Sequence, residues 1–142
     1  MNIRPITPLY AVTPQIDPAD LPAIRDAGFV RVICNRPDAE NPPHLQAAAM
    51  ARAAESAGLD FVVLPLTHDT MTPDNVALQM ELATADGPVL AYCASGTRCS
   101  VVWSLAQAST GALSVDEILE TTARAGYDLS GLRPRLDQLS EG

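Results

Sequence analysis

The residues from Cys93 to Arg98, with the sequence CASGTR, combine a nucleophile, small side chains and a cation in one short segment. Small side chains allow a loop to curl so that its backbone N–H groups point inward and bind an anion. Arg98 adds a permanent positive charge and a fork of donors. Such surroundings stabilise a thiolate, so we predict that Cys93 is a nucleophile whose pKa lies below the usual value of about 8.5. Four residues would hold an anionic substrate against its sulfur: Ala94, Ser95, Gly96 and Thr97.

The pattern of apolar and capping residues predicts the elements that position this loop. Short β-branched or apolar runs predict strands at 9–12, 29–34, 61–64 and 88–92. Capping residues, early prolines and closing glycines predict helices at 17–28, 41–57, 72–85 and 98–110, one more from Ser114, and a short one beyond Ser130. This alternation predicts an α/β fold, a three-layer αβα sandwich around a mainly parallel sheet of about four or five strands.

Two further loops, at 35–38 and 67–70, come after predicted strands, and parallel sheets bind ligands at the carboxyl ends of their strands. Asp69 is our candidate for a general acid, although a solvent-exposed carboxylate is the simpler interpretation. Arg36 would either add a second positive contact for the anion or pair with Asp38 or Glu40. The strand before Cys93 and the helix after it favour a functional cysteine over a structural one beside an ordinary turn.

Composition narrows the class of protein. The 142 residues fit one domain, 1–142, and the net charge of −8 disfavours nucleic acid as a partner. Three cysteines do not form a secreted disulfide framework, so we expect a cytoplasmic protein. The longest apolar run, 61–66, is far shorter than the ~18 residues of a membrane span. No residues stand at metal-ligand spacing and no glycine-rich cofactor fingerprint occurs, so we expect no metal and no cofactor.

Several segments resemble one known family, in the same order along the chain: 9–16, 35–38, 92–98 and 125–129. The sequence resembles the phosphatase-like domain family of beta-lactamase-hydrolase-like proteins, described as candidate rhodanese-type sulfur transferases. The resemblance implies a fold like that of the dual-specificity phosphatases. It also implies Cys93 as the nucleophile and Arg98 as the anion clamp.

The chain departs from phosphatases of this fold at two positions beside the loop. Such phosphatases place His before the cysteine, where this chain has Tyr92. They place Ser or Thr after the arginine to support the thiolate, where this chain has Cys99. We expect Cys99 to face the core and the hydroxyl of Thr97 or Ser100 to support the thiolate instead.

Loop length separates two chemistries. Tyrosine phosphatases carry five residues between cysteine and arginine, whereas this loop has the four residues 94–97, as rhodaneses have. A narrower ring suits a persulfide sulfur better than a phosphoryl group. We therefore predict a sulfurtransferase that moves sulfane sulfur from thiosulfate or a persulfide to an acceptor thiol through a Cys93 persulfide. A phosphatase working through phospho-Cys93 is the alternative. A non-catalytic anion- or persulfide-binding partner of a sulfide-oxidising enzyme is the third hypothesis.

Cys34 ends the predicted strand 29–34, at the edge where Cys93 lies. Some phosphatases of this fold place a second cysteine there and form a reversible disulfide with the nucleophile. By that resemblance we predict a redox role, in which Cys34 traps oxidised Cys93 before it over-oxidises. The two Cα atoms would have to lie within roughly 7 Å. A small apolar core residue is the equally weighted interpretation.

Overall fold

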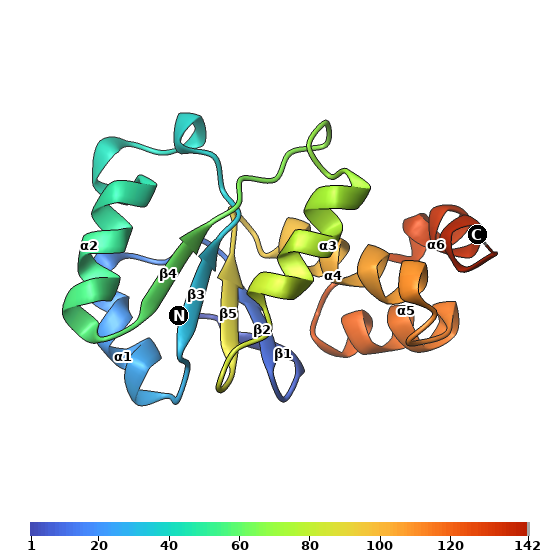
Figure 1. Cartoon of the computed structure of the whole chain (residues 1–142), viewed down its shortest axis with the longest axis horizontal. Helices are drawn as coiled ribbons and strands as arrows, with labels where there is room; N and C mark the ends of the chain where they lie inside the picture. Colours follow the sequence, from blue (N-terminus) through green and yellow to red (C-terminus); the bar gives the residue numbers. More distant parts are fainter. Residues whose placement is uncertain (142) are drawn as a thin grey trace.

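The computed structural model describes residues 1–141 and shows a five-stranded sheet with the strand order β1-β2-β5-β3-β4 (Figure 1). β1 is antiparallel to β2, and all other neighbours are parallel. The strands are β1 Arg4–Thr7, β2 Tyr10–Thr13, β3 Arg31–Cys34, β4 Asp60–Val63 and β5 Val89–Tyr92.

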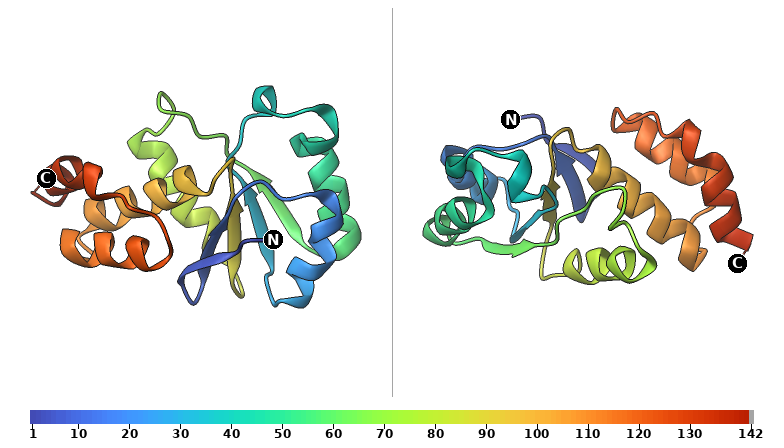
Figure 2. Two further views of the ribbon diagram at one scale, coloured as in Figure 1. Left: turned by 180° about the vertical axis from the view of Figure 1, so that it is seen from behind. Right: turned by 90° about the horizontal axis from the view of Figure 1, so that it is seen from above.

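Helices cover both faces of this sheet, and Figure 2 shows the layers from behind and from above. On one face lie α1 Leu21–Asp26 and α2 Ala47–Ala57. On the other lie α3 Pro73–Leu82 and α4 Thr97–Thr110, and against α4 pack α5 Val115–Arg124 and α6 Arg133–Glu141. Short 3-10 helices occupy 18–20, 38–40, 43–45 and 130–132. The predicted fold class, a three-layer α/β sandwich with a mainly parallel sheet, is confirmed.

Local chemistry explains where the helices begin and end. Asp17 and Ser114 each form a capping box, and the Thr72 hydroxyl accepts the N–H of Asn75. Gly58 and Gly111 end α2 and α4 in the left-handed conformation, at φ 80° and 69°. These signals are readable in the sequence, and the predicted ends of α2 and α4 agree with them.

Three elements of the structure differ from the predictions by more than a shift of one to three residues at their ends. The hairpin strand β1 is not predicted, because Pro5 lies within it, Pro8 follows it, and Ile6 is its only buried residue. The helix predicted at 17–28 is a 3-10 turn followed by α1. The helix predicted from Asn41 begins only at Ala47, because extended backbone at Pro42 and Gln46 encloses a separate 3-10 turn.

The strands alternate their side chains between two hydrophobic clusters. Val12, Ile33 and Ala91 face α3 to α6, whereas Val32 and Leu90 face α1 and α2. Because β3, β4 and β5 are parallel and in register, their carboxyl ends share one edge of the sheet. Among residues 1–141, no helix is long and apolar enough to cross a membrane.

Candidate active site

Cys93 lies directly after β5, and its sulfur is the floor of a loop closed by the start of α4. The residue is fully buried, and its Sγ accepts the backbone N–H of Gly96 at 3.1 Å. Gly96 is the N-cap of α4 and has φ 90°, a conformation that favours glycine. A Cβ at Gly96 would collide with the Tyr127 hydroxyl, which donates to the carbonyl of Ser95 at 3.0 Å. The small residue is therefore required both for the turn and for space.

The surroundings lower the pKa of Cys93 to about 5. The largest cause is a hydrogen bond from the Cys99 side chain; burial opposes the shift. Backbone hydrogen bonds from Cys99, Ser95 and Gly96 lower the pKa further. The sulfur is therefore a thiolate at neutral pH, in the direction that the sequence predicts.

Cys99 is the first cause of the low pKa of Cys93, in addition to the hydroxyl that the sequence leads us to expect. Ser100 Oγ donates to the carbonyl of Gly96 at 3.0 Å, so its hydrogen is engaged elsewhere. Thr97 Oγ1 accepts from Ser95 Oγ at 2.9 Å, and support of the thiolate by the Thr97 hydrogen stays a prediction. Cys99 is fully buried, and burial followed by its hydrogen bond to Cys93 raises its pKa well above the usual value. It therefore stays protonated and can serve as a donor.

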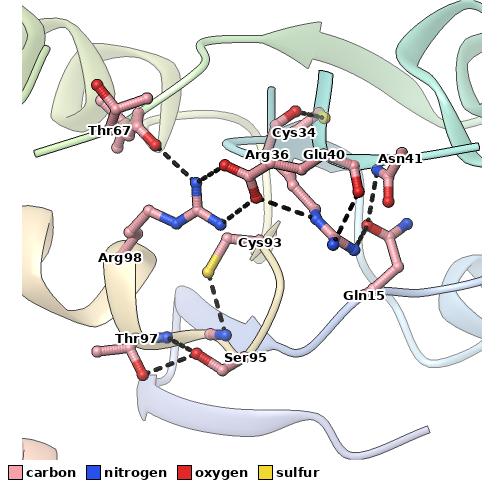
Figure 3. Close-up of polar contacts among 12 residues, drawn as sticks. Gln15, Cys34, Arg36, Glu40, Asn41, Thr67, Cys93, Ser95, Thr97 and Arg98 are labelled. Atoms are coloured by element: carbon pink, nitrogen blue, oxygen red, sulfur yellow. Dashed lines mark hydrogen bonds and ion pairs between the residues drawn. The ribbon is translucent and has the colours of Figure 1, made fainter. Parts of the chain in front are cut away.

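Arg98 forms an ion pair with Glu40, which the sequence suggested only as a partner for Arg36. Its Nη1 and Nη2 donate to the two oxygens of Glu40 at 2.9 and 2.7 Å, and Nη1 also donates to the carbonyl of Leu66 at 2.9 Å (Figure 3). Glu40 is the first cause of the raised pKa of Arg98. In return, Arg98 lowers the pKa of Glu40. The guanidinium is thus held in a fixed orientation over the loop.

The bonds to Glu40 and Leu66 leave some N–H donors of Arg98 without an oxygen partner in the part of the chain that the structure describes. A guanidinium has five N–H donors, and three of those of Arg98 are used. Within residues 1–141, Nε–H and one Nη2–H keep no oxygen partner, and these two point in parallel from one edge of the group. Cys93 is among the causes of the raised pKa of Arg98, so the guanidinium lies near enough to the sulfur for their charges to interact. Arg98 can therefore offer a two-donor fork to an oxyanion bound over Cys93.

Arg36 shares the same carboxylate. Its Nε donates to Glu40 Oε1 at 3.2 Å, its Nη2 to the Glu40 carbonyl at 3.2 Å and its Nη1 to Gln15 Oε1 at 3.2 Å. The pairing with Glu40 is one of the two predicted alternatives. A direct contact between Arg36 and substrate stays a prediction. Glu40 lies far from Arg98 in sequence and carries no motif, so its part in the site could not be read from the residues alone.

Asp69 lies on the segment after β4, as predicted. Thr67 and Thr70 close this turn with mutual hydrogen bonds, and Leu66, at its start, accepts Arg98. The carboxylate of Asp69 is exposed and makes no ion pair or hydrogen bond within the described part of the chain. The structure brings its loop to the site without bringing the side chain into contact, and its role as general acid stays a prediction.

Cys34 ends β3 at the expected edge, but its side chain packs on the other face of the sheet. The sheet register pairs Cys34 with Tyr92, and both belong to the cluster against α1 and α2, whereas Cys93 belongs to the opposite cluster. Burial raises the pKa of Cys34. The structure therefore brings Cys99, and not Cys34, against the nucleophile. A redox link to Cys34 stays a prediction that requires it to leave this packing; peptide mapping after peroxide treatment tests it.

Among residues 1–141, no three or more His, Cys, Asp or Glu residues are grouped so that they could hold a metal ion.

Comparisons with known proteins identify a family to which this chain is similar. The family model described as "Beta-lactamase hydrolase-like protein, phosphatase-like domain" matches residues 2–110. Curated proteins named beta-lactamase hydrolase-like protein are 32% identical over 123 residues in Agrobacterium fabrum and 30% identical over 130 residues in Xylella fastidiosa, covering 86% and 91% of this chain. The chain spans only 28% and 30% of the length of these relatives.

Solved structures agree with the fold along almost the whole chain. A candidate phosphatase from Neisseria meningitidis Z2491 is 35% identical, with a TM-score of 0.87 over 98% of this chain and 99% of that one. Tk-PTP in its active form is 18% identical, with a TM-score of 0.71 over 99% and 97%. A cysteine-to-serine variant of P. aeruginosa TpbA in complex with pTyr is 15% identical, with a TM-score of 0.68 over 98% and 88%. The last two share the fold.

Proposed function

The chain belongs to the phosphatase-like domain family of beta-lactamase hydrolase-like proteins, and from that membership we propose that it is a cysteine-dependent phosphohydrolase. Its substrate is a small phosphomonoester, and its intermediate is phospho-Cys93. One observation carries the proposal: Cys93, whose pKa is lowered to about 5, lies near Arg98, and the bonds of Arg98 to Glu40 and Leu66 leave two of its N–H donors for an anion. The reported relatives favour this reaction over the sulfur transfer predicted from loop length, since their names speak of phosphatases.

The proposed reaction has two steps. The Cys93 thiolate attacks phosphorus, the phosphorus–oxygen bond to the leaving group breaks, and the alkoxide takes a proton from an acid. Asp69 is the proposed acid, because its loop begins at the Leu66 carbonyl that Arg98 holds. Water then attacks phospho-Cys93, releasing inorganic phosphate and restoring the thiolate. Arg98 and the inward N–H groups of the loop stabilise the negative charge in both steps.

Sulfur transfer remains a second candidate, because the four residues between Cys93 and Arg98 make a narrower ring than phosphatases have. In that reaction the thiolate takes the outer sulfur of thiosulfate and releases sulfite, and an acceptor thiolate then removes the sulfur as a persulfide. No general acid is needed. Asp69 therefore discriminates between the two reactions.

The test measures both reactions on the same preparations. We expect wild type to hydrolyse an aryl phosphate, Cys93→Ser to lose at least about 10³-fold in kcat, and Asp69→Asn to lose about 10²-fold. Asp74→Asn, another exposed aspartate, is the matched control and should keep its activity. Mass spectrometry would detect phospho-Cys93 in a rapidly quenched sample.

Two results would overturn the phosphohydrolase. Transfer of sulfur from thiosulfate to a thiol, with a persulfide on Cys93 and no phosphate release, would establish the sulfurtransferase. Binding of a small anion or persulfide with neither turnover would leave a non-catalytic module, the case in which a sulfide-oxidising enzyme is the proposed partner.

A further inference from the structure

Three buried polar side chains form a continuous hydrogen-bond network beneath the Cys93 loop. Tyr10 comes from β2, Asn35 lies directly after β3, and Gln79 lies in α3; none is more than 4% exposed. The amides of Asn35 and Gln79 exchange two hydrogen bonds, each at 2.9 Å. Gln79 Nε2 also donates to the Tyr10 hydroxyl at 3.3 Å, and that hydroxyl donates to the carbonyl of Cys99 at 2.8 Å.

The network leaves no amide or hydroxyl hydrogen without an acceptor. Asn35 Nδ2 donates its second hydrogen to the carbonyl of Leu64 at 2.9 Å. Because the Tyr10 oxygen accepts Gln79, its own hydrogen must point at Cys99. A buried polar group costs roughly 1–3 kcal/mol when it lacks a partner, so this arrangement tolerates little displacement of any member. The position of each side chain is therefore fixed by the others.

The same network reaches both chemical groups of the site. On one side it ends at the Cys99 carbonyl, in the first turn of α4, the helix whose N-cap residue Gly96 donates its N–H to the Cys93 sulfur at 3.1 Å. Cys99 is also the first cause of the low pKa of Cys93. On the other side the backbone of Asn35 donates to Tyr92, the residue before Cys93, at 2.9 Å. The carbonyl of Asn35 accepts Leu66, whose own carbonyl holds Arg98.

We propose that Tyr10, Gln79 and Asn35 form a positioning network that fixes the first turn of α4 against the Cys93 loop, keeping the donors of Cys99 aimed at the nucleophile. None of the three is a catalytic residue, because none touches the sulfur or the place of the substrate. Tyr10 is the direct link, since its hydroxyl bonds the backbone of Cys99 itself. The proposal deepens the proposed function and rests on Cys93 acting as its nucleophile.

The experiment measures the reactivity of Cys93 without any substrate. Tyr10→Phe removes one hydroxyl and keeps the ring. We expect the midpoint pH for alkylation of Cys93 by iodoacetamide to rise, so that the rate at pH 5 falls about two- to threefold. Peptide mapping identifies the alkylated cysteine, and Cys93→Ser supplies the blank. Gln79→Met, which removes the donor to Tyr10 and both bonds to Asn35, should shift the midpoint in the same direction.

Ser104→Ala is the matched control. Ser104 is also buried on α4, but its hydroxyl bonds the carbonyl of Ser100 at 2.8 Å, outside the network. It should lose stability in urea without moving the midpoint. A Tyr10→Phe midpoint that stays at the wild-type value, or moves no more than that of Ser104→Ala, would overturn the proposal. If Tyr10→Phe does not fold, Gln79→Met decides by the same criterion.

The readout also separates this proposal from the proposed function. A shifted midpoint in a protein that turns over no phosphate ester would retain the positioning network and reject the phosphohydrolase. Turnover of the ester with an unshifted midpoint in both variants would do the opposite.

Discussion

Two cysteines end neighbouring strands of this sheet and differ in almost everything that decides their chemistry. Cys34 closes β3 and Cys93 comes directly after β5, and both are almost completely buried. Burial raises the pKa of Cys34, whereas the pKa of Cys93 is lowered to about 5 in spite of burial. Burial and position at the sheet edge are common to both, so neither accounts for the difference.

The difference comes from the segment that each cysteine leads into. After Cys93, the loop supplies the N–H groups of Ser95 and Gly96, and the first turn of α4 supplies the N–H and the thiol of Cys99. After Cys34, the chain continues into a three-residue 3-10 helix, 38–40, and the thiol donates to the carbonyl of Arg36 at 3.4 Å. A strand end places a thiol at the edge; a helix that starts there with its donors inward makes it a nucleophile.

The largest expected effect is on the pH dependence of stability, where the two cysteines should act with opposite sign. The unfolded chain holds a thiol with a pKa of about 8.5. Because the folded pKa of Cys93 is lower, the ionised Cys93 stabilises the fold fully above pH ~8.5, and this contribution is lost as pH falls toward 5. The folded pKa of Cys34 is raised, so its contribution is full below about 8.5 and is lost at higher pH.

Urea unfolding of wild type, Cys93→Ser and Cys34→Ser between pH 5 and 10 measures this contrast. Relative to Cys93→Ser, the free energy of unfolding of wild type should increase by up to about 5 kcal/mol as pH rises from 5 to 9. Relative to Cys34→Ser, it should lose stability above pH ~9. Parallel stability curves for the two variants would show that the sites are not electrostatically distinct.

The next effect tests which donor makes Cys93 different. Cys99→Ala removes the thiol that is the first cause of the low pKa of Cys93. The midpoint for alkylation of Cys93 should rise by about one unit, so that the rate at pH 5 falls about fivefold. Cys99→Ser keeps a donor and should retain most of the wild-type rate. If both variants kept the wild-type midpoint, the backbone N–H groups alone would support the thiolate.

The sequence was sufficient for those parts of the site that are local. The spacing of Cys93 and Arg98, the glycine at the turn and the start of the adjoining helix lie within six residues, and their neighbours determine their structure. Gly58 and Gly111 likewise marked helix ends correctly. Such features depend on backbone conformations that a few adjacent residues set.

The features that could not be predicted depend on register and long-range packing. The face on which Cys34 lies is set by its pairing with Tyr92, and the sequence does not reveal that register. Cys99 was expected to face the core and does, but contact with the Cys93 sulfur requires the loop geometry. Glu40 and Leu66, which follow β3 and β4, both accept hydrogen bonds from Arg98, a meeting of three separate segments that depends on the tertiary fold.

The smallest expected effect concerns the ion pair between Glu40 and Arg98. It tests whether the segment after β3, which carries Glu40, contributes to catalysis by Cys93. Glu40→Gln keeps an oxygen that can accept one bond from Arg98 but removes the charge that holds the guanidinium in a bidentate pair. Since Arg98 lowers the pKa of Glu40, the clamp is ionised throughout the neutral range. We expect kcat/KM for the aryl phosphate to fall about three- to tenfold, because Arg98 then samples orientations in which its Nε and Nη2 donors miss the oxyanion.

Glu55→Gln, a change at an exposed glutamate of α2, is the matched control for altered net charge. A rise in kcat/KM in Glu40→Gln would contradict this view of the clamp. Such a rise would mean that Glu40 competes with the substrate for Arg98 instead of orienting it. In that case Glu40, in the segment after β3, would inhibit the reaction at Cys93 by occupying Arg98, and the segment after β3 would oppose catalysis at the end of β5.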